Sequence, residues 1–354
     1  MGKIKHYIGV VATVIVLTAV VYIGLTSIYK LPQAASAQAG PIDTMFSVHF
    51  MLISFLFALI MAFMLYSVVF FRRKPGDEED AAHVHGNTTL EIAWTVIPLI
   101  VVIIFAVWAV DVFADLVRPN PDEMVVKVTG QQWSWTFEYP EQGGFSSNEL
   151  YLPVDQPILL EMGSTDVIHS FWVPEFRVKQ DLVPGYTTKL RITPTELGEY
   201  RVVCAEICGG AHSQMTAPVI VMETTAFESW AEERASGPAY GDMTAQERGE
   251  IWYTTQGCAG CHSVDGSALV GPTWLGIYGR EEELENGESV TVDDEYIRNS
   301  ILDPSADIVA GYTPSMPAIY GDQFATLEAK ILESDGIEID VIDDIIAFMQ
   351  TLEE

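Results

Sequence analysis

The sequence predicts a chain of three parts: a membrane-embedded helical head, an all-β sandwich or barrel, and a small all-helical domain. Long apolar stretches fill the first 117 of its 354 residues, which carry only 6 basic and 8 acidic side chains. The middle of the chain alternates apolar with polar residues between closely spaced turn signals, as strands do. The last part combines a Cys-x-x-Cys-His motif with apolar residues at helical spacing.

The charge of the chain is strongly acidic and unevenly distributed. There are 18 Lys and Arg against 49 Asp and Glu, a net charge of −31, and residues 118–354 carry −29 of it. A nucleic-acid partner is excluded on electrostatic grounds, because phosphate binding requires a basic surface. Disorder is excluded as well, since 49% of the residues are hydrophobic and can bury a core.

Three apolar stretches, residues 8–28, 44–71 and 92–110, reach the roughly 20 residues that a bilayer-spanning helix requires. Basic residues precede the first stretch and follow the second, and such clusters belong on the cytoplasmic side. Everything after the third stretch is therefore expected outside the cytoplasm. The basic residues are Lys3, Lys5, Arg72, Arg73 and Lys74.

The first apolar stretch has two interpretations. Ala35-Ser36-Ala37 resembles a signal-peptidase site, and cleavage there would start the mature chain at Gln38. The apolar region of a signal peptide runs about 7–15 residues, whereas this one has 21, which favours a retained span. We expect residues 1–43 to be an N-terminal span or signal segment with its linker, and residues 44–117 to be a transmembrane hairpin.

The β-rich part, residues 118–228, contains a cluster of metal-binding residue types. Two thiols, an imidazole and a thioether lie within twelve residues, and a second imidazole lies 35 residues earlier, before a run (170–174) that is a poor core strand. Thiolate, thioether and imidazole ligands together favour copper, and two thiolates can bridge two ions. A disulfide and a tetrahedral zinc site remain open alternatives at this point. The residues are His169, Cys204, Cys208, His212 and Met215.

A second cofactor motif lies in residues 241–354, after a linker expected at 229–240. Cys258, Cys261 and His262 form C-x-x-C-H, in which two thiols bond the haem vinyl groups and the histidine binds the iron. A redox C-x-x-C is the alternative, but it usually belongs to a βαβ pattern, which this sequence lacks. Met316 in a Pro-flanked loop is favoured as the sixth ligand over Met349, which falls in a helical apolar period.

These motifs resemble subunit II of cytochrome c oxidase, and the resemblance covers residues 44–225. It rests on the loop 204–215, on Asp166-Val167-Ile168-His169-Ser170, and on the aromatic run from Gln131 to Tyr139. The resemblance implies a cupredoxin-like sandwich that carries a binuclear copper centre, CuA. Cys204 and Cys208 would then bridge both coppers. His169 and Met215 would complete one copper, and His212 with the backbone carbonyl of Glu206 would complete the other.

The resemblance implies further roles for three residues. The Glu206 carboxylate would bind a Mg or Mn ion shared with subunit I, and Trp133 would be the point of electron entry. Glu91 would lie at the mouth of a proton pathway into subunit I. The alternatives are core packing for Trp133 and an ordinary interfacial group for Glu91.

The C-terminal part resembles a class I cytochrome c, an all-α fold in which Met316 would be the distal haem ligand and the Pro272 carbonyl would hold the His262 ring. The run Glu281-Glu282-Glu283 is expected to be a solvated loop. The order of hairpin, copper domain and haem domain matches a subunit II with a fused cytochrome c, integral to the bacterial plasma membrane, with both soluble domains on the extracytoplasmic side.

The implied function is electron relay in a proton-pumping terminal oxidase, from a donor through haem c and CuA to haem a in subunit I, where oxygen is reduced to water. Partners would be subunits I and III and a donor such as a soluble cytochrome, a copper protein or an upstream respiratory complex. Alternatives are the electron-input subunit of a CuA-type nitric oxide reductase and a free-standing membrane-anchored electron carrier. A quinol oxidase subunit is excluded, because it would lack Cys204 and Cys208.

Overall fold

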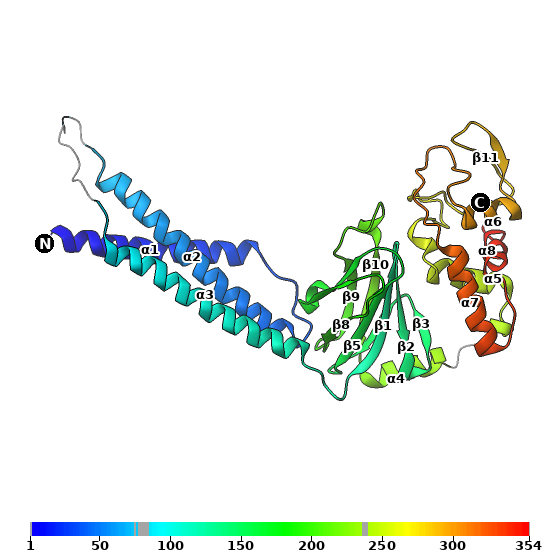
Figure 1. Ribbon diagram of the computed structural model, residues 1–354, viewed down its shortest axis with the longest axis horizontal. Coiled ribbons are helices and arrows are strands. Elements are labelled where there is room, and N and C mark those ends of the chain that lie inside the picture. Colours follow the sequence, from blue (N-terminus) through cyan, green and yellow to red (C-terminus); the bar gives the residue numbers. More distant parts are fainter. Residues whose placement is uncertain (1, 74–75, 77–84, 236–239, 354) are drawn as a thin grey trace. The chain divides into compact units, whose positions relative to one another are not determined.

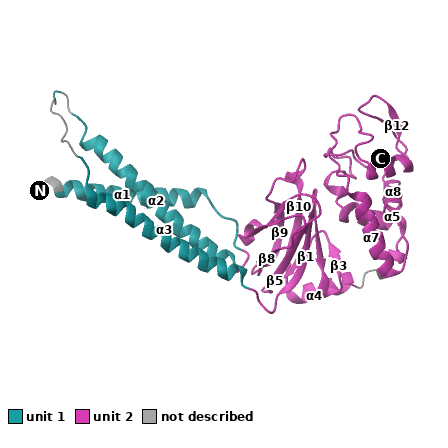
Figure 2. Cartoon of the chain, in the orientation of Figure 1, with its two compact units in different colours: residues 1–34, 38–118 teal, residues 35–37, 119–354 magenta. Residues whose placement is uncertain are grey.

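The computed structural model describes residues 2–73, 76, 85–235 and 240–353, and the chain divides into two compact units (Figures 1 and 2). The first unit comprises residues 1–34 and 38–118, and the second comprises residues 35–37 and 119–354. Lys74, one of the expected cytoplasmic basic residues, and residues 236–239 of the expected linker lie outside the described residues.

The first unit consists of long apolar helices, and all three of those described are long and apolar enough to cross a membrane. Helix α1 packs on α2, where the ring of Tyr66 lies over Gly9 and its hydroxyl is 3.0 Å from Nδ1 of His6. The Asn87 side chain caps α3 by accepting a hydrogen bond from the Leu90 amide. The helices are α1 (Gly2–Ile28), α2 (Ala39–Phe70) and α3 (Thr88–Val117).

The second unit begins with a β-sandwich of two five-stranded sheets (Figure 1). One sheet has the order β3-β2-β1-β5-β8 and the other has the order β4-β10-β9-β6-β7. In β2, alternate residues enter the core, as its burial pattern shows. The strands are β1 (Met124–Gln131), β2 (Ser134–Tyr139), β3 (Phe145–Ser147), β4 (Leu150–Pro153), β5 (Ile158–Ser164), β6 (His169–Trp172), β7 (Lys179–Leu182), β8 (Thr188–Ile192), β9 (Gly198–Cys204) and β10 (Thr216–Met222).

Mixed pairing of the strands brings distant residues together at one end of the sandwich. Strand β1 runs antiparallel to β2 and parallel to β5, with Val126 opposite Leu160. Strand β6 pairs antiparallel with β9, with Phe171 opposite Cys204. The start of β6 and the end of β9 therefore lie side by side.

Two expectations for this domain are corrected. The run after His169 is a core strand, because Ser170 and Phe171 are almost fully buried in β6. The expected linker also begins later, because helix α4 (Thr224–Ala235) occupies its first residues. Burial of Phe227 and stacking of Trp230 on Tyr151, at 4.2 Å between ring centroids, hold this helix on the sandwich.

The C-terminal part is helical apart from one small hairpin. Helices α5 and α8 cross so closely that a Cβ on Gly249 would lie 2.0 Å from the Asp344 carbonyl oxygen, so only glycine fits there. The Glu281 run forms the first strand of the hairpin, and not the solvated loop that we expected. The elements are α5 (Ala245–Thr255), β11 (Glu281–Glu283), β12 (Ser289–Thr291), α6 (Asp294–Leu302), α7 (Tyr320–Asp335) and α8 (Val341–Met349).

Short 3-10 turns complete the described structure of the second unit. Two of these turns carry cofactor-motif residues: one contains His212, within the 204–215 loop, and another begins at Cys258, the first cysteine of the C-x-x-C-H motif. These turns are η1 (Pro140–Gln142), η2 (Pro174–Phe176), η3 (His212–Gln214), η4 (Tyr240–Asp242) and η5 (Cys258–Gly260).

Candidate metal centre and haem site

The paired strands β6 and β9 bring His169 next to the two cysteines of the 204–215 loop. The Cys204 sulfur lies 3.8 Å from the Cys208 sulfur and 3.9 Å from Nδ1 of His169. One ligand atom from each of these three buried residues falls within 4.8 Å of the others, a spacing that can hold a metal ion. The two sulfurs are too far apart for the S–S bond of about 2.05 Å, so they are free thiols in this structure.

The loop brings three more donor atoms to the same cluster. Met215 is fully buried and its sulfur lies 3.7 Å from the Cys208 sulfur. His212, in the turn η3, approaches the same sulfur with Nδ1 at 3.5 Å. The carbonyl oxygen of Glu206 lies 3.2 Å from the Cys204 sulfur. Two thiols, two imidazoles, a thioether and a carbonyl thus face one small volume.

A buried carboxylate fixes the orientation of His169. Oδ1 of Asp166 lies 2.8 Å from Nε2 of His169, so the ring presents Nδ1 to Cys204. The backbone amide of Gln132 donates to the other oxygen of Asp166 at 2.6 Å. Outer carboxylate partners of this kind are typical of metal-binding histidines. This role of Asp166 was not foreseen from the sequence, although its position three residues before a candidate ligand was a usable signal.

The aromatic run holds the loop by its backbone. Nε2 of Gln132 and Nε1 of Trp133 both donate to the Cys208 carbonyl oxygen, at 2.6 and 3.2 Å. Gly209, with φ of +123°, lets the loop approach so closely that a Cβ there would lie 2.9 Å from the Trp133 ring. Neither of these hydrogen bonds to the Cys208 carbonyl was foreseen from the sequence.

The electrostatics of the cluster favour one thiolate and one thiol. Contact with the Cys208 thiol, together with His169 and nearby amides, holds the pKa of Cys204 well below its usual range, against the opposing effect of burial. The same contact raises the pKa of Cys208. Burial alone would lower the pKa of His169, but its hydrogen bond to Asp166 raises it overall. A bound cation would replace the shared proton, since metal binding requires deprotonated cysteines.

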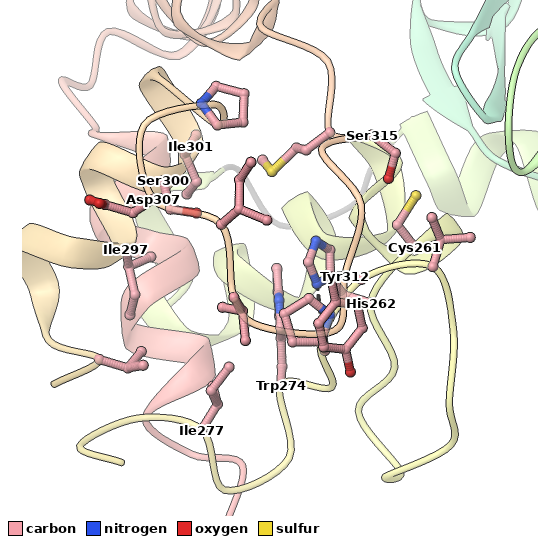
Figure 3. A pocket seen from close by; sticks show the side chains of 18 of the residues that line it. Cys261, His262, Trp274, Ile277, Ile297, Ser300, Ile301, Asp307, Tyr312 and Ser315 are labelled. Atoms are coloured by element: carbon pink, nitrogen blue, oxygen red, sulfur yellow. Dashed lines mark hydrogen bonds between the residues drawn. The ribbon is translucent and has the colours of Figure 1, made fainter. Parts of the chain in front are cut away.

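Cys261 and His262 of the C-x-x-C-H motif line a pocket of about 900 Å³, counting its open mouth (Figure 3). The His262 ring lies beside Trp274, at 5.5 Å between centroids, and its Nδ1 is 2.8 Å from the Pro272 carbonyl oxygen. Burial lowers the pKa of His262, which keeps the imidazole neutral and able to bind a metal through Nε2. Gly271 makes room for this ring, because a Cβ there would lie 2.6 Å from it.

The two candidate methionines occupy different environments. Met316 follows Tyr312 in the loop before α7 and contributes to the pocket and to a second cavity that Cys258 also lines. Met349 also reaches the pocket wall, but it is 4% exposed and belongs to the apolar side of α8. The donors available for a haem are therefore the two thiols, the His262 imidazole and the Met316 thioether.

The remaining expected site residues differ in exposure. Trp133 is buried, at 4% exposure, between the Cys208 carbonyl and the haem-motif segment. Glu206 is exposed beside the cysteine cluster. Glu91 is exposed in the first turn of α3, where its carboxylate accepts a hydrogen bond from the Asn87 amide at 3.2 Å. Glu91 belongs to the first unit, whereas the other expected site residues belong to the second.

A cupredoxin-like sandwich with a cluster of thiols, a thioether and imidazoles that could hold metal, attached to apolar helices, is typical of membrane-anchored electron-transfer proteins that use copper. Comparison with known families narrows this class. Residues 24–112 match the family model for the transmembrane domain of cytochrome c oxidase subunit II, and residues 145–224 match the model for its periplasmic domain.

Two individual relatives agree with these family matches. Cytochrome c oxidase subunit 2 of Alkalihalophilus pseudofirmus is 32% identical over 297 residues, covering 79% of this chain and 85% of the relative. The subunit 2 of Thermostichus vulcanus is 33% identical, over 63% of this chain and 85% of the relative. A crystal structure of the periplasmic domain of subunit II of cytochrome oxidase from Bradyrhizobium japonicum is 30% identical, with a TM-score of 0.32, over 32% of this chain and 95% of that one.

The chain belongs to the cytochrome c oxidase subunit II family, and it is thus the electron-input subunit of a haem-copper oxidase. The three apolar helices and the matched periplasmic domain make it an integral membrane protein whose soluble domains lie outside the cytoplasm.

Proposed function

We propose that this chain relays single electrons from a donor through a covalently bound haem c to a binuclear CuA centre, and onward to haem a in subunit I of a proton-pumping terminal oxidase. Reduction of oxygen to water would take place on subunit I. The observation that carries the proposal is the convergence of two thiols, two imidazoles, a thioether and a carbonyl at the end of β9.

The residues of this cluster fit a two-copper site. Cys204 and Cys208 would bridge the two ions, and the capping ligands would divide between them: His169 and Met215 on one copper, and His212 and the Glu206 carbonyl on the other. Such a centre supplies reversible one-electron chemistry when it is bound.

Side chains around the cluster hold its candidate ligands in fixed positions. Asp166 fixes the ring of His169, and the side chains of Gln132 and Trp133 fix the Cys208 backbone. Because these ligands are buried and held by hydrogen bonds, they do not need to rearrange when the charge at the centre changes.

The C-terminal domain fits a haem by the same criteria. Cys258 and Cys261 would attach it covalently, His262 would be its proximal ligand, and Met316 would be its distal ligand. The neutral His262 ring is oriented by the Pro272 carbonyl, which accepts a hydrogen bond from Nδ1 and leaves Nε2 for the iron.

The exposed carboxylates would serve the junction with the rest of the complex. We propose that Glu206 binds a Mg or Mn ion shared with subunit I, and that Glu91 lies at the entrance of a proton pathway into that subunit. Subunit III and a donor, which would be a soluble cytochrome, a copper protein or an upstream respiratory complex, complete the expected partners.

Metal and haem analysis of the purified complex tests the proposal. We expect two copper ions and one haem c per copy of this chain, together with a co-purifying subunit that carries haem a. A partner that reduces nitric oxide would favour a nitric oxide reductase, and the absence of any large membrane subunit would favour a free-standing carrier. A chain that holds no copper would contradict the proposal.

A further inference from the structure

The haem-attachment segment lies directly against the aromatic run of the sandwich within the second unit. Nε2 of Gln131, at the end of β1, donates to the Gln256 carbonyl oxygen at 3.1 Å. Nε2 of Gln323, on α7, donates to Oε1 of Gln131 at 3.2 Å and to Oε1 of Gln256 at 2.8 Å. These three residues, the glutamine cluster, join β1, the end of α5 and α7.

The backbone of the haem motif also lies close to the aromatic run of the sandwich. Gly257 has φ of +83°, and a Cβ there would lie 2.6 Å from Oγ of Ser134. A Cβ on Gly260 would lie 3.5 Å from the Trp133 carbonyl oxygen. Cys261 packs against the core of the sandwich. The residues that would carry the haem thus touch the segment that contains Trp133.

A second polar contact lies beside the glutamine cluster. The side-chain amide of Asn148 donates a hydrogen bond to the Thr254 carbonyl oxygen, near the end of α5. Asn148 lies between β3 and β4, so a different loop of the sandwich engages the same helix end. The glutamine cluster and the Asn148 contact therefore define one orientation of α5 relative to the sandwich.

Burial of Gln131 makes the glutamine cluster favour the docked arrangement of the two domains. Gln131 is 5% exposed, and both ends of its amide are paired across the contact. A buried amide without partners is costly, so this side chain favours the docked arrangement over a separated one. Trp133 connects the proposed haem site with the cysteine cluster. Its backbone carbonyl lies next to Gly260 of the haem motif, and its indole donates a hydrogen bond to the Cys208 carbonyl.

We propose that Gln131, Gln256 and Gln323 are positioning residues that hold the haem-attachment segment on Trp133. The inference rests on the proposed electron relay and adds to it the place of transfer. Being part of one chain keeps the two domains near each other, and the glutamine cluster supplies their orientation. Trp133 is consequently covered by the chain's own C-terminal domain, and a soluble donor must deliver its electron to that domain.

Thiol cross-linking in the purified holo-complex tests the docked geometry. Cysteines replace Asn148 and Thr254, and a short bifunctional thiol reagent should join them about tenfold faster than in a control pair, Asn148→Cys with Gln246→Cys, since the docked pair is held at high effective concentration. Gln246 is exposed at the opposite end of the same helix. Equal rates in the two pairs would overturn the docked arrangement, whatever the cofactors do.

Flash-photolysis kinetics test the positioning role. Gln131→Ala and Gln323→Ala should each slow electron transfer from haem c to the copper centre about tenfold, because each substitution removes two hydrogen bonds of the glutamine cluster. Gln246→Ala, the matched control, should transfer at the unaltered rate. Copper content, haem content and both reduction potentials should stay unchanged in all three variants, which a general loss of structure would not allow.

The outcomes separate the two proposals. Unchanged transfer in both Gln131→Ala and Gln323→Ala would overturn the positioning role while leaving the relay intact. Loss of the cross-linking preference together with slower transfer in the Gln323→Ala variant would support it, because Gln323 lies on α7 and contacts neither cysteine loop. A copper-free chain that still cross-links at the fast rate would contradict the relay and not the docking.

Discussion

The His169 ring lies between two partners: Nε2 is 2.8 Å from Oδ1 of Asp166, and Nδ1 is 3.9 Å from the sulfur of Cys204. Asp166 itself is held by the Gln132 amide, in the residue next to Trp133. The metal-facing nitrogen is therefore selected by the Asp166 carboxylate, and the aromatic run positions that carboxylate.

Replacing Asp166 with Asn should weaken copper binding. Outer partners of metal-binding histidines typically contribute about 10–100-fold in metal affinity, because they fix the ring and increase its basicity. Competition with a copper chelator measures the effect, with the exposed Asp181→Asn as the control. Haem content should be unaffected, and equal copper retention in the two variants would show that Asp166 has no such role.

Replacing Cys204 or Cys208 with Ser should remove the copper centre and leave the haem in place. The two sets of ligands lie on separate elements, at the end of β9 and after α5. Donor should still reduce the haem, and electrons should then accumulate there. Copper analysis and haem absorbance in the same sample check this, and normal oxygen consumption by either variant would contradict the order of the relay.

Met316→Ala should change the haem absorption spectrum, whereas Met349→Ala should change the stability of the haem domain. The first should abolish the long-wavelength absorption band of a methionine-ligated ferric haem, because Met316 is the proposed distal ligand. The second should keep the band but lower the free energy of unfolding of the haem domain by about 2–5 kcal/mol, as for other buried methionines. Absorption spectra of the oxidised variants decide the assignment, and survival of the band in Met316→Ala refutes it.

Trp133→Ala should slow transfer from haem c to the copper centre by about tenfold, since it removes a hydrogen bond to the Cys208 backbone of about 1 kcal/mol together with the packing of the ring. Trp133→Phe keeps an aromatic ring and removes only the hydrogen bond, so a smaller effect is expected. The measurement is the rate after photoreduction of the haem. Identical rates in Trp133→Ala and the unaltered chain would reduce this residue to a packing role.

Asp344→Ala should destabilise the C-terminal domain by about 3–5 kcal/mol, the usual cost of breaking a buried ion pair. Asp344 is 2% exposed and accepts hydrogen bonds from Arg248 at 2.6 Å and from Trp252 at 3.0 Å, joining α5 to α8. Denaturant unfolding followed by haem absorbance measures the loss. The exposed Asp322→Ala on α7 should change stability little, and equal midpoints for both variants would contradict the prediction.

Much of the fold was predictable because its signals are local. The three apolar stretches became α1, α2 and α3, and the strand-like middle of the chain became the two sheets of the sandwich. The predicted fold class is confirmed in its layout. The strand at 169–172 was missed because its two large apolar residues, Phe171 and Trp172, are adjacent and give no alternating signal, and because its burial depends on pairing with β9.

The sequence by itself determined the ligand types and their local spacing. Cys204 with Cys208, and Cys258 with His262, lie in single short loops, so their mutual distances are limited by a few backbone bonds. Cofactor chemistry could be inferred from those residue types without any knowledge of the fold.

Only the tertiary structure decided which groups support these ligands. Asp166 meets His169 after a turn, Gln132 reaches Cys208 across 76 residues, and Gln323 reaches Gln131 across 192. Carboxamides and carboxylates are common on any surface and have no periodic pattern, so their partners depend on strand register and on how distant elements pack. Register and packing are properties of the whole domain, which is why these contacts became visible only in three dimensions.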